Sequence, residues 1–482
     1  MEYSSFIYRK EYFIAINFDT QTYAKKLKAE SQFLPFYQCF FYLSVMILIY
    51  TPKITSRAKY AFNLVFRDIY GIKFELTSEK ESYLNHSGAK LTYSNQPFAD
   101  ELFIQSKGLL FETGIVDQDI SVFNWKDTKA FFSVGPKSAL PFDIFSASFF
   151  LASRYEEYLP HIRDIYDRFD AQASLAYSYN FLHQPVVNKW AVHFKEALLL
   201  KYPALSFPVK KYRFISSIDV DNAYAYLEKG VVRTLGGFLK SLSTMDIKGF
   251  KERLKVLTGV EKDPYDTYDF QLELQKKYNL EYLYFLLLGD YGVNDKNISV
   301  ESKKFRSLIK SLADYAQVGI HPSFGSNGNP AQLAKEVARL QGVINREVFK
   351  SRQHFLKISL PDTYRNLIEL DIQEDYTMGY ASDYGFRAGL CTPFFFYDLD
   401  LEVETSLKIY PFAIMEGTLK YYQKIPPERA MEHYKNVIDQ VKAVNGIFIS
   451  LWHNDSMNDR GLWKGWRKVY IDMVEYAKPD GN

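Results

Sequence analysis

Short apolar runs alternate with polar and helical stretches through the second half of the chain. The runs cover 212–218, 280–288, 316–320, the residues before Arg352, 375–382, 409–415 and 446–452. Strands that alternate with helices in this way are typical of a parallel sheet. We therefore predict an α/β fold in which residues 210–477 form a distorted (β/α) barrel of about seven strands. Residues 224–279 are expected to be a helical insertion after the first strand.

The first half of the chain has a mixed pattern. Strand-like runs separated by polar turns lie at 73–76, 90–94, 102–106 and 109–112. Apolar residues at helical spacing predict a helix over 142–158, with Pro141 near its start. We predict a smaller mixed α/β domain over 46–205, which begins with a strand from Met46 and a helix at about 55–70. The proline- and lysine-containing stretch near 200–211 is the expected linker.

The first residues of the chain allow two interpretations. Residues 31–52 carry no charge and are long enough to cross a bilayer, but Pro35 and Gln38 interrupt the apolar run. We expect a buried strand from Met46, with residues 1–45 as an appendage outside the fold. A membrane-associated helix at 33–50 is the alternative. Because a basic segment and a small-residue cleavage site are missing from this region, it does not resemble a secretory signal, and a cytoplasmic location is expected.

Composition excludes some classes of partner. The 482 residues include 59 Lys and Arg against 57 Asp and Glu, a net charge of +2. This balance argues against nucleic acid as the main partner, which would require a strongly basic face. The two cysteines, Cys39 and Cys391, lie far apart in the sequence, so neither a disulfide framework nor a cysteine metal site is expected.

Residues capable of catalysis or metal binding follow the predicted strands of the second half. In parallel barrels the carboxyl ends of the strands meet at one rim, and functional residues lie there. The residues at or just after these ends are Asp219, Asp221, His321, Arg352, His354, Arg387, Glu416 and His453. Three histidines and two aspartates on one rim favour a functional site over scattered structural residues.

The order of these motifs resembles a known family. Residues 211–477 resemble the NodB-homology domain of polysaccharide deacetylases, the fold of carbohydrate esterase family four. The family's first, second and last motifs are similar to SIDVDNA, VGIHPSFGSN and ISLWHNDS. Its arginine-containing third motif falls near SRQHFL, and GFRAGLCTPF resembles an Arg-Gly stretch of divergent members. Residues 46–205 resemble the uncharacterised N-terminal domain that precedes such domains in Bacteroidetes-type bacterial proteins, which implies no activity for the first half.

The resemblance implies a metal-dependent hydrolase that removes acetyl groups from an acetylated polysaccharide or glycan precursor. It implies that Asp219 is the base that takes a proton from water and that His453 protonates the leaving group. Arg352 or Arg387 would hold Asp219 ionised, and the motifs leave the choice between them open.

The implied cofactor is a divalent metal. The resemblance makes Asp221 and His321 its ligands, and Asp and His ligands without Cys suit zinc or cobalt. The sequence departs from the family at Gly325, where the second motif usually has a second histidine. Because a catalytic zinc normally has three protein ligands, His354 is the expected replacement. Ser323, Ser326 and Asn327 are weaker candidates.

Two further residues are candidates for substrate binding, Glu416 and Trp452. For Glu416, a salt bridge to Arg387 is the simpler expectation. Two alternative functions also remain open: a catalytically inactive, sugar-binding descendant, which the loss at Gly325 favours, and a glycosyltransferase that holds a metal through Asp219 and Asp221. Metal content would test the first alternative, and sugar-nucleotide binding would test the second.

Overall fold

Three parallel strands form the centre of the larger sheet: β7 (Arg213–Val220), β8 (Glu281–Leu286) and β15 (Ile447–His453). In this computed structural model, which describes residues 47–98 and 100–479, their side chains are almost continuously buried. Continuous apolar runs are characteristic of parallel strands that are covered on both faces.

Further short strands extend this sheet. They are β9 (Gln317–Ile320), β10 (Lys350–Ser351), β11 (Glu374–Asp375), β12 (Phe394–Asp398), β13 (Val403–Ile409) and β14 (Ile414–Met415). The order is β12-β13-β11-β10-β9-β8-β7-β15-β14, and every neighbouring pair is parallel except β12–β13. The predicted α/β class with a parallel sheet is confirmed, whereas closure into a barrel stays a prediction. The β12–β13 hairpin was not predicted.

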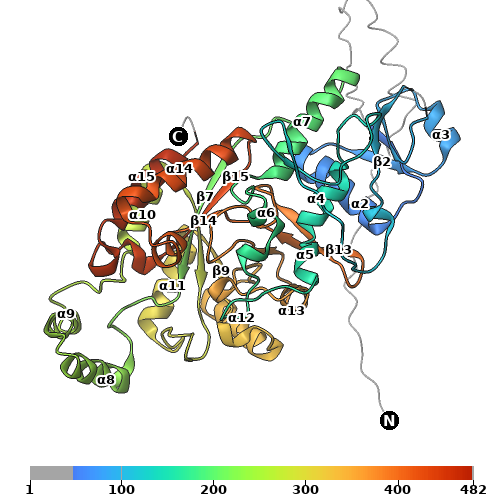
Figure 1. The fold of residues 1–482 in the computed structure, drawn as a ribbon. Coiled ribbons are helices and arrows are strands. Elements are labelled where there is room, and N and C mark those ends of the chain that lie inside the picture. Colours follow the sequence, from blue (N-terminus) through green and yellow to red (C-terminus); the bar gives the residue numbers. More distant parts are fainter. Residues whose placement is uncertain (1–46, 99, 480–482) are drawn as a thin grey trace, which may run out of the picture. The chain divides into compact units, whose positions relative to one another are not determined.

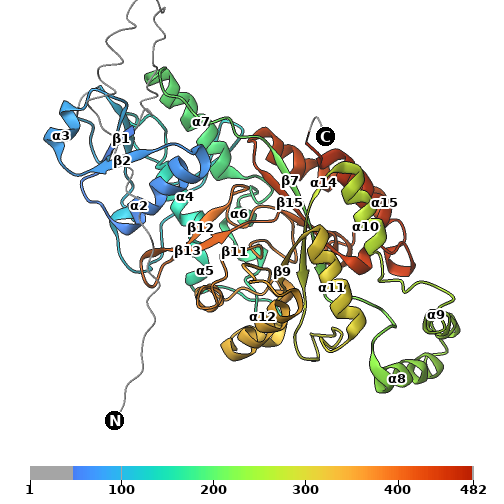
Figure 2. The same ribbon diagram turned by 180° about the vertical axis from the view of Figure 1, so that it is seen from behind.

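Helices connect these strands, as the alternating pattern predicts. They are α8 (Gly230–Ser243), α9 (Ile247–Leu257), α10 (Tyr268–Tyr278), α11 (Lys303–Tyr315), α12 (Pro330–Ile344), α13 (Asp362–Ile368), α14 (Pro427–Ala443) and α15 (Trp466–Ala477). The first three form the predicted insertion between β7 and β8. Figures 1 and 2 show α8 and α9 standing apart from the sheet, whereas α14 and α15 pack together beside β15.

The first half contains a smaller, parallel sheet. Its strands are β1 (Ile47–Tyr50), β2 (Phe74–Thr77), β3 (Lys90–Ser94) and β4 (Leu102–Gln105), in the order β2-β1-β3-β4. A separate hairpin joins β5 (Phe123–Trp125) and β6 (Thr128–Ala130). The helices are α2 (Ser56–Phe62), α3 (Lys80–Asn85), α4 (Ile144–Ala152), α5 (Tyr155–Tyr158), α6 (Leu175–Ser178) and α7 (Val186–Lys201).

Two local predictions in this half are wrong. The strand expected at 109–112 is a 3₁₀ turn over Leu109–Phe111. The helix expected over 142–158 divides into α4 and α5, because Arg154 adopts a left-handed backbone with φ of 56°. A left-handed residue cannot continue a right-handed helix, and its side chain is redirected toward the second half.

The two halves share one apolar core. The Tyr60 ring on α2 lies 4.9 Å from the Tyr397 ring on β12, and its hydroxyl donates a hydrogen bond to the Phe395 carbonyl. Nearby, the buried Arg57 guanidinium forms an ion pair with Glu402. The β12–β13 hairpin therefore anchors α2 to the larger sheet.

The predicted appendage at 1–45, and Met46 itself, lie outside the described residues. Of the alternative membrane helix at 33–50, the described residues Ile47–Tyr50 form strand β1. Within the part of the chain that the structure describes, no helix has the length and apolarity needed to cross a bilayer.

Candidate metal centre and catalytic pocket

The pocket begins where the alternation of β7 and β15 reaches the strand ends. Side chains on one face of a strand recur every second residue, so Ile215 and Asp219 share a face, as do Ile449 and His453. Ile215 and Ile449 belong to a small apolar cluster between the strands. Asp219 and His453 are register partners on the adjacent strands. Each therefore places a polar side chain at the carboxyl end of its strand, next to that cluster.

Three side chains converge beyond these strand ends: Asp221 after β7, His321 after β9 and His354 after β10. One ligand atom from each lies within 4.8 Å of the others. The Nε2 atom of His321 lies 3.2 Å from Asp221 Oδ1, and that of His354 lies 3.4 Å from Asp221 Oδ2. Asp221 Oδ1 is buried and has no hydrogen bond within the described residues. A buried carboxylate oxygen that faces imidazole nitrogens in this way fits a metal ion between them.

In both candidate histidine ligands, the ring nitrogen that faces away from Asp221 is held by a second contact. The Nδ1 atom of His321 lies 2.5 Å from the Arg352 carbonyl oxygen, and that of His354 lies 2.8 Å from Asp295 Oδ1. Each contact leaves Nε2 directed at Asp221. Metal-bound histidines are commonly fixed in this manner by a carbonyl or a carboxylate.

Asp221 and the neighbouring histidines stabilise the charged forms of one another. Burial raises the pKa of Asp221, but His354, His321 and His453 together bring that pKa well below its ordinary value. Burial lowers the pKa of His354, while Asp221 and Asp295 raise it more, to about 9. Without a metal, His354 therefore holds a proton at neutral pH, and a bound ion would replace that proton.

Asp219 is held by arginine rather than by the candidate metal ligands. The Arg352 Nη1 atom donates a hydrogen bond of 2.8 Å to Asp219 Oδ1, and both side chains are buried. Asp219 Oδ2 lies 3.7 Å from His321 Nε2. One carboxylate oxygen is thus fixed by the guanidinium, and the other faces the metal candidates.

His453 is paired with Glu416, which follows β14. The Glu416 Oε1 atom accepts a hydrogen bond of 2.8 Å from the His453 backbone N–H and lies 2.8 Å from ring Nδ1. Burial lowers the pKa of His453, but Glu416, Asp221 and Asp219 raise it well above its ordinary value. The other ring nitrogen, Nε2, lies 3.8 Å from Asp221 Oδ2. These carboxylates therefore favour the protonated form of His453 beside the candidate metal site.

Gly325, at the position where the resembled motif has a second histidine, contributes its backbone N–H. Its N–H donates a hydrogen bond of 3.0 Å to Asp295 Oδ2, and the Phe324 N–H donates one of 2.8 Å to Asp295 Oδ1. Asp295 in turn contacts His354. The segment that lacks the second histidine thus holds the carboxylate that orients its expected replacement.

Three expectations from the sequence are wrong. Arg387 does not contact Asp219; its guanidinium donates to both carboxylate oxygens of Glu157, at 2.8 and 2.6 Å, deep between the two halves. Glu416 therefore pairs with His453 instead of Arg387. Trp452 is fully buried, with its ring 4.9 Å from that of Tyr470, so it cannot contact a substrate in the pocket. Alternation along β15 explains this, because neighbours of His453 face the opposite side.

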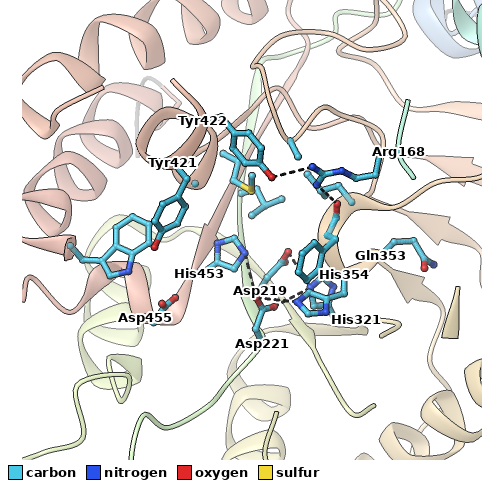
Figure 3. A pocket seen from close by; sticks show the side chains of 17 residues that line it. Arg168, Asp219, Asp221, His321, Gln353, His354, Tyr421, Tyr422, His453 and Asp455 are labelled. Atoms are coloured by element: carbon cyan, nitrogen blue, oxygen red, sulfur yellow. Dashed lines mark hydrogen bonds and ion pairs between the residues drawn. The ribbon is translucent and has the colours of Figure 1, made fainter. Parts of the chain in front are cut away.

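Figure 3 shows the side chains around the cavity, whose volume is about 220 Å³. Asp219, Asp221, His321, His354 and His453 all line it, whereas the roles predicted for them stay predictions. Sequence reasoning missed Asp455, Arg168 and the wall rings Phe355, Tyr421, Tyr422 and Trp463. Of these residues, only Asp455 could have been found from the sequence, because it lies two residues after the strand-end His453. Burial raises the pKa of Asp455 to about 6.

Arg168 brings the first half of the chain to this pocket. Its guanidinium donates hydrogen bonds to the Phe355 carbonyl at 2.7 Å and to the Tyr422 hydroxyl at 3.1 Å. Phe355 and Leu356 both have positive φ, 60° and 55°, in the turn that follows His354. Arg168 thus supports a strained turn next to a candidate metal ligand.

Comparison with known proteins adds a sequence family and several partial structural likenesses. A family of unknown function (DUF7033) matches residues 47–203. No curated protein matches the chain. A protein from Mycobacterium smegmatis, assigned as a polysaccharide deacetylase, is 12% identical over 57% of this chain and 87% of its own, with a TM-score of 0.38.

Two other solved structures are similar over comparable lengths. A polysaccharide deacetylase from Bacillus cereus is 11% identical over 55% of this chain and 88% of its own, with a TM-score of 0.25. A CE4 family pseudoenzyme from Bacillus anthracis is 11% identical over 56% of this chain and 63% of its own, with a TM-score of 0.27. TM-scores this low do not establish a common fold, so the function has to follow from the residues of the pocket.

Proposed function

We propose that this chain is a metal-dependent hydrolase that removes acetyl groups from an acetylated glycan or glycan precursor. The observation that carries the proposal is the convergence of Asp221, His321 and His354, with ligand atoms within 4.8 Å of one another, beside Asp219 and His453. The motif order that resembles polysaccharide deacetylases supports the same conclusion. We also propose that the larger sheet closes into a barrel and that the protein is cytoplasmic.

The metal would be held by Asp221, His321 and His354. When bound, a divalent ion lowers the pKa of water toward neutrality and polarises the acetyl carbonyl. Zinc or cobalt suits one carboxylate and two imidazoles. The support for this ligand set is the buried Asp221 Oδ1, which has an ionic contact with His321 but no hydrogen bond within the described residues.

Asp219 and His453 have complementary proton-transfer roles in this proposal. Asp219 takes the proton from the attacking water, and its ion pair with Arg352 orients it. His453 gives a proton to the leaving nitrogen or oxygen, and its contact with Glu416 keeps it protonated until then. A base and an acid on adjacent strands can act on opposite sides of one acetyl group.

The walls of the pocket fit a sugar substrate. Tyr421 and Trp463 are in ring contact with centroids 5.3 Å apart, and both line the cavity. Aromatic faces bind the apolar faces of sugar rings, while the charged centre below takes the acetyl group. The glycosyltransferase alternative loses support here, because Arg352 occupies Asp219 and leaves one carboxylate of the Asp-x-Asp pair for a metal.

A catalytically inactive sugar-binding protein remains the second candidate, because Gly325 takes the place of a family histidine. The test is metal content by elemental analysis together with acetate release from a panel of N- and O-acetylated oligosaccharides. Asp219→Asn should keep the metal and lower turnover about 10²- to 10⁴-fold through loss of the base. His354→Ala should lose metal, whereas His193→Ala on α7 serves as a histidine control outside the pocket. Wild-type protein that takes up no divalent ion in excess metal would leave only the sugar-binding candidate.

A further inference from the structure

Helix α8 exposes an apolar face to solvent. Its large apolar residues Val231, Val232, Leu235, Leu239 and Leu242 are between 57% and 85% exposed. At 3.6 residues per turn they fall within an arc of about 100°. A surface helix ordinarily buries such a stripe against its own protein, whereas α8 exposes it to solvent.

The contacts of α8 with the rest of the chain explain why the apolar stripe faces outward. The Phe238 ring, which flanks one edge of the stripe, packs against the Phe250 ring of α9, with centroids 4.9 Å apart. Arg233 donates a hydrogen bond to the Asn297 carbonyl and lies over the Tyr291 ring. Arg233 thus holds the side of α8 away from the stripe, and Phe238 holds one edge of it. These contacts leave the stripe itself exposed to solvent.

The exposed apolar surface continues into the turn and α9. Met245 in the turn and Ile247 and Leu254 on α9 are exposed as well. Figures 1 and 2 show both helices apart from the sheet in opposite views. We call α8, the turn and α9 together, residues 230–257, the helical hairpin.

The helical hairpin carries more positive than negative charge, with six Lys and Arg against two Asp and Glu. Lys240, Lys248 and Lys251 are exposed and form no ion pair with any residue the structure describes. Of its two acidic groups, Asp246 caps α9 by accepting a hydrogen bond from the Gly249 N–H. Glu252 accepts hydrogen bonds from Tyr226 and Arg460.

We infer that the helical hairpin docks on the surface of an anionic lipid bilayer. Apolar side chains in the headgroup boundary and lysines near acidic headgroups are the two attractions that bind amphipathic helices to such membranes. The helices, of 14 and 11 residues, are too short to cross a bilayer and would lie along it. Self-association is disfavoured, because a two-fold pair would bring the same unpaired lysines of two copies together.

Docking would also orient the candidate pocket. The helical hairpin follows the carboxyl end of β7, the end at which Asp219 lies, and the Arg460–Glu252 contact of 3.2 Å joins α9 to the segment just before Trp463 in the pocket wall. The pocket would then open close to the membrane, toward glycans attached there. The docking itself does not depend on the proposed hydrolysis and is tested without it.

The experiment is cosedimentation of the full chain with vesicles of phosphatidylcholine, alone or with about one third phosphatidylserine. We expect binding to the acidic vesicles that weakens as salt rises, because screening shortens the reach of the lysines. Leu235→Gln with Leu239→Gln should weaken binding about 100-fold through loss of apolar insertion. Lys240→Gln, Lys248→Gln and Lys251→Gln together should also weaken it about 100-fold.

Matched controls separate this surface from the rest of the chain. Leu200→Gln with Leu401→Gln changes two exposed leucines elsewhere, and Lys53→Gln, Lys276→Gln and Lys310→Gln removes three exposed lysines; both sets should bind as wild type does. All substituted side chains are exposed, so circular dichroism should be unchanged. Absence of vesicle binding, or binding that the hairpin variants leave intact, would overturn the inference. So would light scattering that shows a dimer which the Leu235 and Leu239 substitutions dissociate.

Discussion

His354 Nδ1 lies 2.8 Å from Asp295 Oδ1, although the two residues are 59 positions apart in the chain. Asp295 is itself held by the backbone N–H groups of Phe324 and Gly325. Gly325, at the position where the resembled motif has a histidine, therefore supports His354 through Asp295. Three separate loops of the larger sheet cooperate in placing one candidate ligand.

Asp295→Asn should weaken metal binding about 10- to 100-fold, as expected when a carboxylate that orients a histidine ligand is lost. Titration with zinc or cobalt by calorimetry measures this. Asp290→Asn is the matched control, because Asp290 lies in the same loop but forms exposed ion pairs with Lys335 and Arg339. Equal metal affinity in both variants would show either that His354 binds the metal without help from Asp295 or that His354 is not a metal ligand.

Metal binding should weaken as the pH falls. The pKa of His354 is raised to about 9, so the metal-free imidazole is protonated below that pH and must lose its proton to bind an ion. Each pH unit below 9 should therefore lower the apparent affinity by up to about tenfold. Asp295 raises this pKa, so in Asp295→Asn the decline should begin at a lower pH. Affinity that is independent of pH between 6 and 9 would contradict His354 as a ligand.

Strand-end positions were enough to group the candidate ligands, because the carboxyl ends of parallel strands share one edge. Asp221, His321 and His354 could be placed together for that reason. Asp295 could not, since it lies in an irregular loop well past the end of β8 and belongs to no recognisable motif. Its role depends on a contact that only the folded chain creates.

The choice between Arg352 and Arg387 was also beyond the sequence, because both follow predicted strands. The structure decides it through Glu157, a residue of the first half whose buried carboxylate pairs with Arg387. A contact between residues that are far apart in the chain leaves no recognisable pattern in the local sequence. The β12–β13 hairpin was missed for a related reason: its antiparallel strands interrupt the expected alternation of strands and helices.

Arg387→Ala should destabilise the fold without acting on the chemistry. Glu157 would keep its buried charge with Arg154 as its remaining partner, and breaking a buried pair costs about 3–5 kcal/mol. Urea unfolding measures the change, and Lys468→Ala, which breaks an exposed pair with Asp472, should cost at most about 1 kcal/mol. Metal content per folded molecule should be unchanged. Normal stability with lost turnover would instead return Arg387 to the catalytic residues.

Glu416→Gln should change the pH dependence of acetate release more than metal binding. Glu416 is the largest cause that raises the pKa of His453, against the lowering effect of burial. An acid must be protonated to act, so activity is lost as the pH rises through that pKa. Removing the Glu416 charge lowers the pKa of His453, and the alkaline decline of the rate should move to lower pH.

The amide of Glu416→Gln can still hydrogen-bond the His453 backbone N–H through its oxygen, so the position of the strand end is preserved. A merely structural role for Glu416 would lower the rate equally at every pH and leave the shape of the profile unchanged. His453→Ala supplies the reference, because it removes the acid altogether and should cost about 10²- to 10⁴-fold in rate. If the alkaline limb of Glu416→Gln coincides with that of the wild type while the protein stays folded, His453 is not the proton donor. Asp455, which lines the same pocket and whose pKa burial raises to about 6, then becomes the group to substitute next.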